Sequence, residues 1–190
     1  METRDAIRAR RSIRRFTGGP VPADALRELL DLARYYPSAG NRQPLKFAAF
    51  ASENACAAIF ARLHWAAYLK DFAIAENQRP RAYILIFGDR SVAADFGFSC
   101  GAAAEAILLG AVSLGLCACC LGLAEPAALA GELGFPADKY ELLNVIALGC
   151  GAQKSRAADG GGVRYYEDAD GGLVVPKRPL SETVLRFDAD

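Results

Sequence analysis

The feature that most constrains the fold is an uncharged run that extends from Ala106 to Ala124. Its length is close to that needed to cross a lipid bilayer. Glycines interrupt the run, Glu105 and Glu125 bracket it, and no basic residue flanks it as the anchor of a membrane helix would. We therefore expect a buried helix followed by a buried strand inside a globular domain, and no membrane span.

Helical and strand patterns alternate along the chain. The longest helical pattern runs from Ala93 to Leu114, and its many Gly and Ala residues predict a central helix that packs closely against another backbone, with a subunit interface as a further option. Strands are expected at 46–51, 82–87, 116–123 and 141–148, and shorter helices at 3–9, 22–33, 53–63 and 126–133. This alternation indicates an α/β layered domain. A length of 190 residues suits one domain that covers residues 1–190.

The last part of the chain, residues 150–190, carries no long amphipathic helix. Within it, Asp170-Gly171-Gly172 separates Tyr165-Tyr166 from the apolar stretch 173–175, which suits a β-hairpin. About 40 residues without a helix of their own rarely extend freely from a compact domain. We expect this C-terminal arm to wrap around another surface, and a partner subunit is the obvious candidate.

The charge balance excludes several classes of partner. Lys plus Arg and Asp plus Glu are both 22, so the sequence carries no net charge of the kind that predicts nucleic-acid or membrane binding. The N-terminal residues METRDAIRAR are charged from the second position and lack the apolar core of a secretory signal. We therefore expect a cytoplasmic protein whose six cysteines are reduced thiols.

Basic residues are concentrated near the N-terminus, where residues 4–15 hold six arginines and a single acid, Asp5. The sequence RRSIRRF, residues 10–16, places four guanidinium groups around Ser12. Arg offers forked, charge-assisted donors, so this segment could bind a phosphate. A solvated basic face is the commoner explanation for such arginines alone.

A second polar segment, PSAGNRQP at residues 37–44, is a turn between two prolines. Its side-chain amides offer both donors and acceptors, as the edge of a planar heterocycle requires. The alternative is a turn held only by local hydrogen bonds of its Asn and Ser side chains. Taken together, the phosphate-binding and amide segments predict a nucleotide-like cofactor.

These two segments resemble the signature of the nitroreductase-like FMN-dependent oxidoreductases. Further stretches are similar, in order and separation, to motifs of a compact branch of that family: HWAAYLKDF, ENQRPRAYILIFGD, GLCACCLGL, LLNVIALG and RYYEDADGGLVVPKRPLSE. The resemblance covers nearly the whole chain. It implies an α+β protein with a three-layer α/β/α fold, a central mixed sheet and a C-terminal arm that wraps the partner subunit. It also implies a homodimer that binds FMN at the subunit interface, with each site drawing on both chains.

The resemblance assigns cofactor-binding roles in four places. The first motif would hold FMN with Arg10, Arg11, Ser12 and Arg14, whereas Arg15 is expected on the solvated surface. The partner subunit would place Pro37, Ser38, Asn41 and Gln43 near the flavin ring. Leu121 and Gly122 would approach the flavin with their backbone, and Lys177 and Arg178 would reach the phosphate, unless they are a solvated pair before a proline.

The implied chemistry belongs to the cofactor, so no catalytic side chain is assigned. FMN would accept a hydride from NAD(P)H and pass electrons to a nitroaromatic, a quinone or a similar electron-poor acceptor in a ping-pong sequence. A non-catalytic flavin-binding, storage or sensor protein would use the same cofactor residues, so this alternative stays open. The region 53–80 is shorter than in many relatives, so the acceptor is not carried over from them.

Two further groups of residues have competing interpretations. His64, Trp65 and Tyr68 could line a substrate pocket within residues 64–80, which look like a mobile cover, although His64 could equally be packed or solvent-facing. The cysteines at 117, 119 and 120 suggest a metal or redox module. On a strand, however, Cys117 and Cys119 share one face while Cys120 points away, and the sequence offers no CxxC partner elsewhere. We therefore favour small buried thiols and predict no metal.

Overall fold

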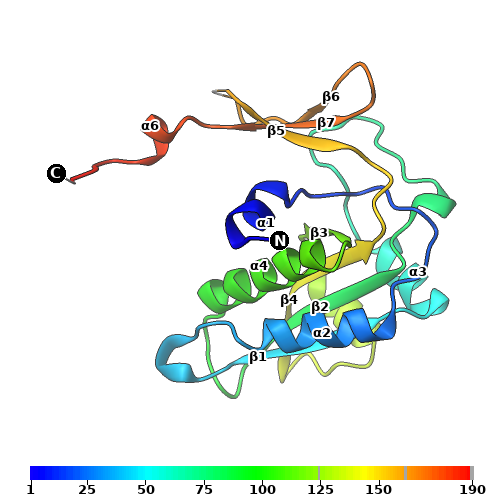
Figure 1. Ribbon diagram of the computed structural model, residues 1–190. Coiled ribbons are helices and arrows are strands. Elements are labelled where there is room, and N and C mark those ends of the chain that lie inside the picture. Colours follow the sequence, from blue (N-terminus) through cyan, green and yellow to red (C-terminus); the bar gives the residue numbers. More distant parts are fainter. Residues whose placement is uncertain (124, 161, 189–190) are drawn as a thin grey trace.

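The computed structural model describes residues 1–123, 125–160 and 162–188 (Figure 1). The helices are α1 (Thr3–Ala9), α2 (Ala23–Ala33), α3 (Glu53–Ala61), α4 (Gly97–Ser113), α5 (Pro126–Glu132) and α6 (Leu180–Thr183), with 3-10 turns η1 (Ala39–Asn41) and η2 (Glu76–Gln78). The strands are β1 (Leu45–Phe50), β2 (Ala82–Asp89), β3 (Cys117–Leu121), β4 (Tyr140–Gly149), β5 (Ser155–Asp159), β6 (Tyr166–Glu167) and β7 (Leu173–Lys177). Over these described ranges, none of the helices combines the length and apolar character that crossing a bilayer requires.

The central sheet has the strand order β1-β2-β4-β3, and its neighbouring strands pair antiparallel. Every residue of β2 is buried. Because successive side chains of a strand point to opposite faces, Ile84 and Ile86 pack into one core whereas Tyr83 and Leu85 pack into another. The continuous apolar run of β2 therefore supplies both faces of the sheet.

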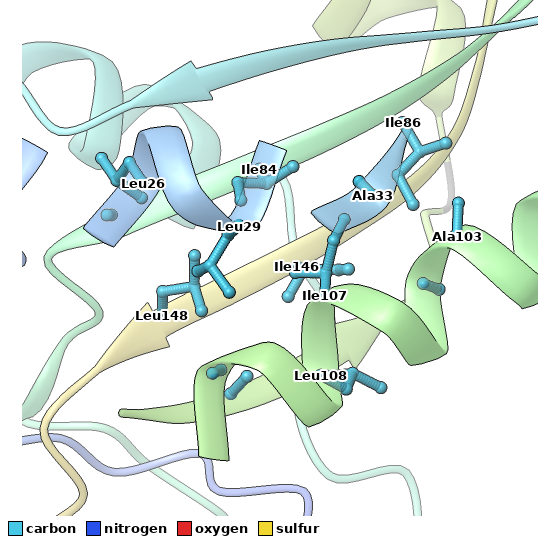
Figure 2. Packing of buried hydrophobic residues seen from close by; sticks show 14 of the residues in the cluster. Leu26, Leu29, Ala33, Ile84, Ile86, Ala103, Ile107, Leu108, Ile146 and Leu148 are labelled. Carbon is cyan, nitrogen blue, oxygen red and sulfur yellow. The ribbon is translucent and has the colours of Figure 1, made fainter. Parts of the chain in front are cut away.

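Helices cover both of these faces. α2 and α4 pack on the first, where Leu29 and Ile107 lie against Ile84 and Ile146 (Figure 2). α3 and α5 pack on the second, which contains Ile59 and Leu129 among others. This arrangement confirms the expected three-layer α/β/α fold. Among the described residues, the parallel pairing of this sheet is limited to a bridge at its β3 edge, between Ser12 and Ala118.

The small residues of α4 allow it to lie close to α2. A Cβ placed on Gly110 would stand 2.7 Å from Cδ1 of Leu32 and 2.9 Å from Cδ2 of Leu29, so only glycine fits there without a shift. The helix begins at Gly97, four residues later than its sequence pattern predicts. The reason is a local turn, in which the carboxylate of Asp95 accepts a hydrogen bond from the backbone N–H of Gly97 at 2.9 Å.

The C-terminal region forms a second, three-stranded sheet in the order β5-β7-β6. β6 pairs antiparallel with β7 across the Asp170-Gly171-Gly172 turn, as predicted, and the Asp168 carboxylate accepts a hydrogen bond from the Gly172 N–H at 2.8 Å. β5, which pairs parallel with β7, was not predicted. Its sequence SRAAD carries no apolar alternation and is mostly exposed, so it is held by backbone pairing.

Beyond β7 the chain extends away from the body of the molecule and ends in the short helix α6 and the residues after it (Figure 1). Large apolar side chains on this stretch are open to solvent, with Leu180 76%, Leu185 104% and Phe187 85% exposed. A single chain therefore leaves the apolar side of its C-terminal arm uncovered.

Candidate functional site

The arginine motif lies along the edge of the central sheet. After α1 the chain runs beside β3, where Ser12 forms its bridge to Ala118 and the N–H of Ile13 donates to the Ala118 carbonyl at 3.1 Å. Side chains alternate on such an extended segment. Ile13 is consequently buried in the core, while Arg10 and Arg14 flank Ser12 at the positions two before and two after it.

Both of these flanking arginines have a buried Nε without a hydrogen-bond partner among the described residues. The Nε of Arg10 lies 3.2 Å from Oε1 of Glu105 on α4, an ion pair that lacks hydrogen-bond alignment. The Nε of Arg14 is also buried, and neither Nε has a hydrogen-bond partner within the described residues. Buried donors are normally paired. Two such donors, at the positions that flank Ser12 on an extended segment, are therefore suited to the oxygens of an anionic ligand.

Arg11 and Arg15 turn away from this pair. The Nη2 of Arg11 donates to the carbonyl of Arg8 at 2.6 Å, and burial together with the neighbouring charge of Arg10 lowers the pKa of Arg11. Arg15 was expected on the solvated surface, but it is half-buried. It forms an ion pair with Glu167 at 2.8 Å and covers the ring of Phe72 at 4.4 Å, contacts that depend on segments distant in sequence.

The amide turn lies between α2 and β1, at the opposite side of the molecule from the C-terminal arm (Figure 1). Its backbone is unusual, because Asn41 and Gln43 have φ of 52° and 49° and Gly40 has φ of 58°. The N–H of Gln43 donates to Oγ of Ser38 at 3.0 Å. A left-handed backbone costs of order 1 kcal/mol for a residue with a side chain, and such conformations concentrate at ligand-binding sites.

The side chains of this turn face outward. Asn41, Gln43 and Pro37 are exposed, and Ser38 is half-buried. A cavity of about 280 Å³ adjoins the turn and is lined by Ser38, Ala39, Arg42, Pro44, Ala93, Ala94, Asp95, Phe98 and Ser99. Phe98, at the start of α4, is 72% exposed. The amides and this aromatic ring are thus available to another molecule.

The end of β3 offers open backbone. Leu121 is buried, whereas Gly122 is exposed and no atom lies within 4 Å of the position that a Cβ would take. A flat ligand could therefore approach the main chain at Gly122, which directly follows the strand that forms the bridge to Ser12.

The three candidate substrate residues occupy different environments. His64 is exposed to solvent. Trp65 packs on Phe60, with ring centroids 5.5 Å apart, and its Nε1 is buried without a partner in the described part of the chain. Tyr68 is 49% exposed and makes an edge contact with Tyr165 at 5.1 Å.

Tyr165 is a residue that the sequence did not single out as part of the site. The guanidinium carbon of Arg14 lies 4.9 Å from its ring centroid, and its hydroxyl oxygen accepts a hydrogen bond from the backbone N–H of Tyr68 at 3.4 Å. The only signal for it was an aromatic pair before the predicted hairpin. Tyr165 links a candidate cofactor residue to a candidate substrate residue.

A family model described as the nitroreductase family matches residues 7–150. This chain belongs to the nitroreductase family. A comparison with curated proteins gives no match. The family model extends from the last residues of α1 through β4 and therefore includes the arginine motif, the amide turn and the end of β3.

Solved structures of similar fold agree with this membership. A candidate nitroreductase from Desulfovibrio desulfuricans, crystallised in complex with FMN, is 27% identical with a TM-score of 0.77, and the match covers 100% of this chain and 99% of that one. An NADH oxidase candidate from Clostridium acetobutylicum is 26% identical with a TM-score of 0.63, covering 77% of this chain and 87% of that one. A nitroreductase from Bacteroides fragilis with bound FMN is 22% identical with a TM-score of 0.62 and a coverage of 80% and 89%, a likeness that supports the fold alone.

The C-terminal arm of this nitroreductase-family chain carries the late basic pair. Lys177 ends β7 and Arg178 follows it, and both side chains are exposed. The arm lies outside the range of the family model, but it is included in the full-length match to the Desulfovibrio protein. Within the described residues of one chain, no ion pair or hydrogen bond joins this pair to the arginine motif.

The cysteine triplet is arranged by the alternation of β3. Cys119 is fully buried and Cys117 half-buried, whereas Cys120 is exposed and its thiol donates to Oδ1 of Asn144 at 3.0 Å. Burial raises the pKa of Cys119 to about 11 and also raises that of Cys117. A thiol with a high pKa is a weak nucleophile and a weak metal ligand at neutral pH. In the described ranges no three His, Cys, Asp or Glu side chains are grouped to hold a metal ion.

Proposed function

We propose that this chain is an FMN-dependent oxidoreductase of the nitroreductase type, which passes electrons from NAD(P)H to an electron-poor acceptor such as a nitroaromatic or a quinone. The observation that supports this most strongly is the pair of buried Nε donors of Arg10 and Arg14, two positions before and after Ser12, which make no hydrogen bond within the described residues, although that of Arg10 is ion-paired with Glu105. The Desulfovibrio relative was crystallised with FMN, whose phosphate is an anion of the kind that such donors bind.

Different residues of the chain would bind different parts of the cofactor. Arg10, Ser12 and Arg14 bind the phosphate end of the cofactor, with Lys177 and Arg178 as further cations. The open backbone at Gly122 leaves room for the flat ring, because no side chain fills that space. When bound, FMN supplies a ring that takes a hydride from a nicotinamide and returns the electrons to a second substrate.

We further propose a homodimer in which residues 37–43 of one subunit complete the site of the other. The amides of this turn are exposed and held in a left-handed backbone, as expected of groups arranged for a ligand. The exposed apolar residues of the C-terminal arm need a surface to cover them. Residues 1–190 would then act as a single flavin-binding domain, with residues 150–190 as an arm around the partner.

An absorption spectrum of the purified protein tests this function. We expect a bound flavin whose visible absorbance bleaches when NADH or NADPH is added without oxygen and returns when menadione is added. A colourless protein that does not take up supplied FMN would contradict the proposal. A bound flavin that neither nicotinamide reduces would instead indicate a storage or sensor protein.

A further inference from the structure

A cavity of about 300 Å³ is lined by residues of α3, of the loop after Phe16 and of the chain that leads into β2. Four of the side chains around it are charged, namely Glu53, Glu76, Arg79 and Arg81. None of the residues assigned to the cofactor lines this cavity. It is therefore a separate candidate for binding a ligand.

The wall of the cavity on the side of α3 is held in place by several contacts. The guanidinium carbon of Arg79 lies 4.5 Å from the ring centroid of Phe60, and the ring of Trp65 packs on Phe60 at 5.5 Å. The thiol of Cys56 donates to the carbonyl of Arg81 at 3.6 Å, which joins α3 to the start of β2. A ligand in the cavity would thus meet a fixed aromatic ring beside a fixed cation.

Arg79 has capacity to bind an anion. Its Nε is buried and makes no hydrogen bond within the part of the chain that the structure describes. Neither Arg79 nor Arg81 forms an ion pair with another described residue. Because buried donors are normally paired and a guanidinium group offers forked donors, the oxygens of an anionic ligand are the partners that suit Arg79.

A second buried polar group without a partner lies near Arg79. Tyr83 is fully buried, and its hydroxyl makes no hydrogen bond among the described residues. Burial raises the pKa of Tyr83, and the charge of Arg79 acts in the opposite direction, so the two side chains are close enough to interact. Both unpartnered groups can donate a hydrogen bond, which again favours a ligand that supplies acceptor oxygens.

The remaining charges limit the kind of anion. Glu53 and Glu76 also line the cavity, so a doubly charged phosphate would be repelled more strongly than a singly charged carboxylate. We propose that this cavity binds a small monocarboxylate with a flat apolar body, which Arg79 holds by its charge and Phe60 by its ring. This inference does not depend on the proposed function, because the two sites share no residue.

The experiment titrates the purified protein, with any flavin that it retains, with benzoate as the probe. Isothermal titration calorimetry should give a dissociation constant of about 1 mM, as expected for so small a ligand. Trp65 is the only tryptophan and packs on Phe60, so its fluorescence should change over the same range of concentration. Benzyl alcohol and benzylamine, which keep the ring without the carboxylate, and inorganic phosphate should each bind at least about tenfold more weakly.

Two pairs of variants locate the binding. Arg79→Gln should weaken benzoate binding at least about tenfold, whereas Arg27→Gln, at an exposed arginine paired with Asp24, should not change it. Ala57→Leu places a larger side chain in the cavity and should weaken binding by a similar factor. Ala58→Leu makes the same change at the next residue of α3, which is also exposed but does not line the cavity, and should have no effect.

Three results would overturn the inference. The first is the absence of both heat and a fluorescence change up to about 20 mM benzoate. The second is equal affinity of the Ala57→Leu and Ala58→Leu proteins, which would place the benzoate elsewhere, the flavin site included. The third is benzylamine binding as tightly as benzoate, which would mean that the acidic residues select the ligand. Each of these results leaves the proposed function unaffected, since reduction of a bound flavin tests that function separately.

Discussion

Arg10 and Glu105 connect the arginine motif to the longest helix, with Nε of the arginine 3.2 Å from Oε1 of the carboxylate. The pair fixes the start of the motif, and the Ser12 bridge to β3 fixes its middle. Arg10 still has an unpartnered donor within the described structure, because the ion pair is not aligned as a hydrogen bond. The helix thus holds the guanidinium group of Arg10 by charge attraction, without a hydrogen bond to its Nε.

The first prediction concerns Arg14. Replacing it with Ala removes one of the two unpartnered donors beside Ser12, so flavin occupancy should fall at least about tenfold, as expected for a lost hydrogen bond to a charged group. Flavin released from the purified protein by heating gives the measurement. Arg15→Ala is the matched control, since that guanidinium is paired with Glu167 and should not affect flavin content. Equal losses in both variants would show that general positive charge, not Arg14, retains the cofactor.

The second prediction concerns the backbone of the amide turn. Gln43 has φ of 49°, so Gln43→Gly should raise the free energy of unfolding by about 0.5–1 kcal/mol while weakening flavin binding. Arg42→Gly is the control, because Arg42 has φ of −69° and glycine should only destabilise the chain there. Urea unfolding and flavin titration measure the two quantities. A Gln43→Gly protein that is less stable than the natural one would exclude stored strain at this position.

Much of the fold was predictable from local patterns, whereas the departures depend on pairing between distant segments. The apolar run 82–87 predicted a buried strand, and the Gly and Ala content of α4 predicted the close approach seen at Gly110. β5 was missed because SRAAD is exposed and is defined only by its partner β7.

In the candidate site too, local sequence predicted some residues, whereas contacts between distant segments define the others. The arginine motif could be read from a dense local cluster, and the structure places it on the sheet edge. The contacts of Arg15 and Tyr165 join residues more than 50 positions apart, so nothing in their own neighbourhood predicted them. The roles of the individual cofactor and substrate residues remain predictions.

The third prediction tests the packing of α4 on α2. Gly110→Ala should reduce the free energy of unfolding by about 1–3 kcal/mol, because the added methyl group would stand under 3 Å from Leu32 and Leu29. Gly131→Ala on α5 has open space around the new methyl group and should be neutral or slightly stabilising. Denaturant unfolding of both variants checks this. Equal stability of the two would mean that α2 does not lie this close to α4.

The fourth prediction concerns alkaline pH. Burial raises the pKa of both Cys119 and Cys100 to about 11 from the usual value of 9.0. Below pH 9 both thiols are protonated in the folded and the unfolded chain, so they contribute no pH dependence. Between pH 9 and 11 the unfolded chain loses more protons than the folded one, so the free energy of unfolding should fall with rising pH, by about 1 kcal/mol per pH unit for each thiol. Urea unfolding of Cys119→Ala should show a shallower decline over that interval, and an unchanged slope would contradict the assignment.

The most direct test of the shared site is complementation between two inactive chains. Arg14→Ala and Asn41→Ala should each bind flavin poorly when purified alone. When the two are co-expressed in equal amounts, half of the dimers are mixed, and one site of each mixed dimer has both residues, so about a quarter of all sites should regain flavin. Flavin content no higher than that of the separate variants would contradict a site built from the arginine motif of one subunit and the amide turn of the other.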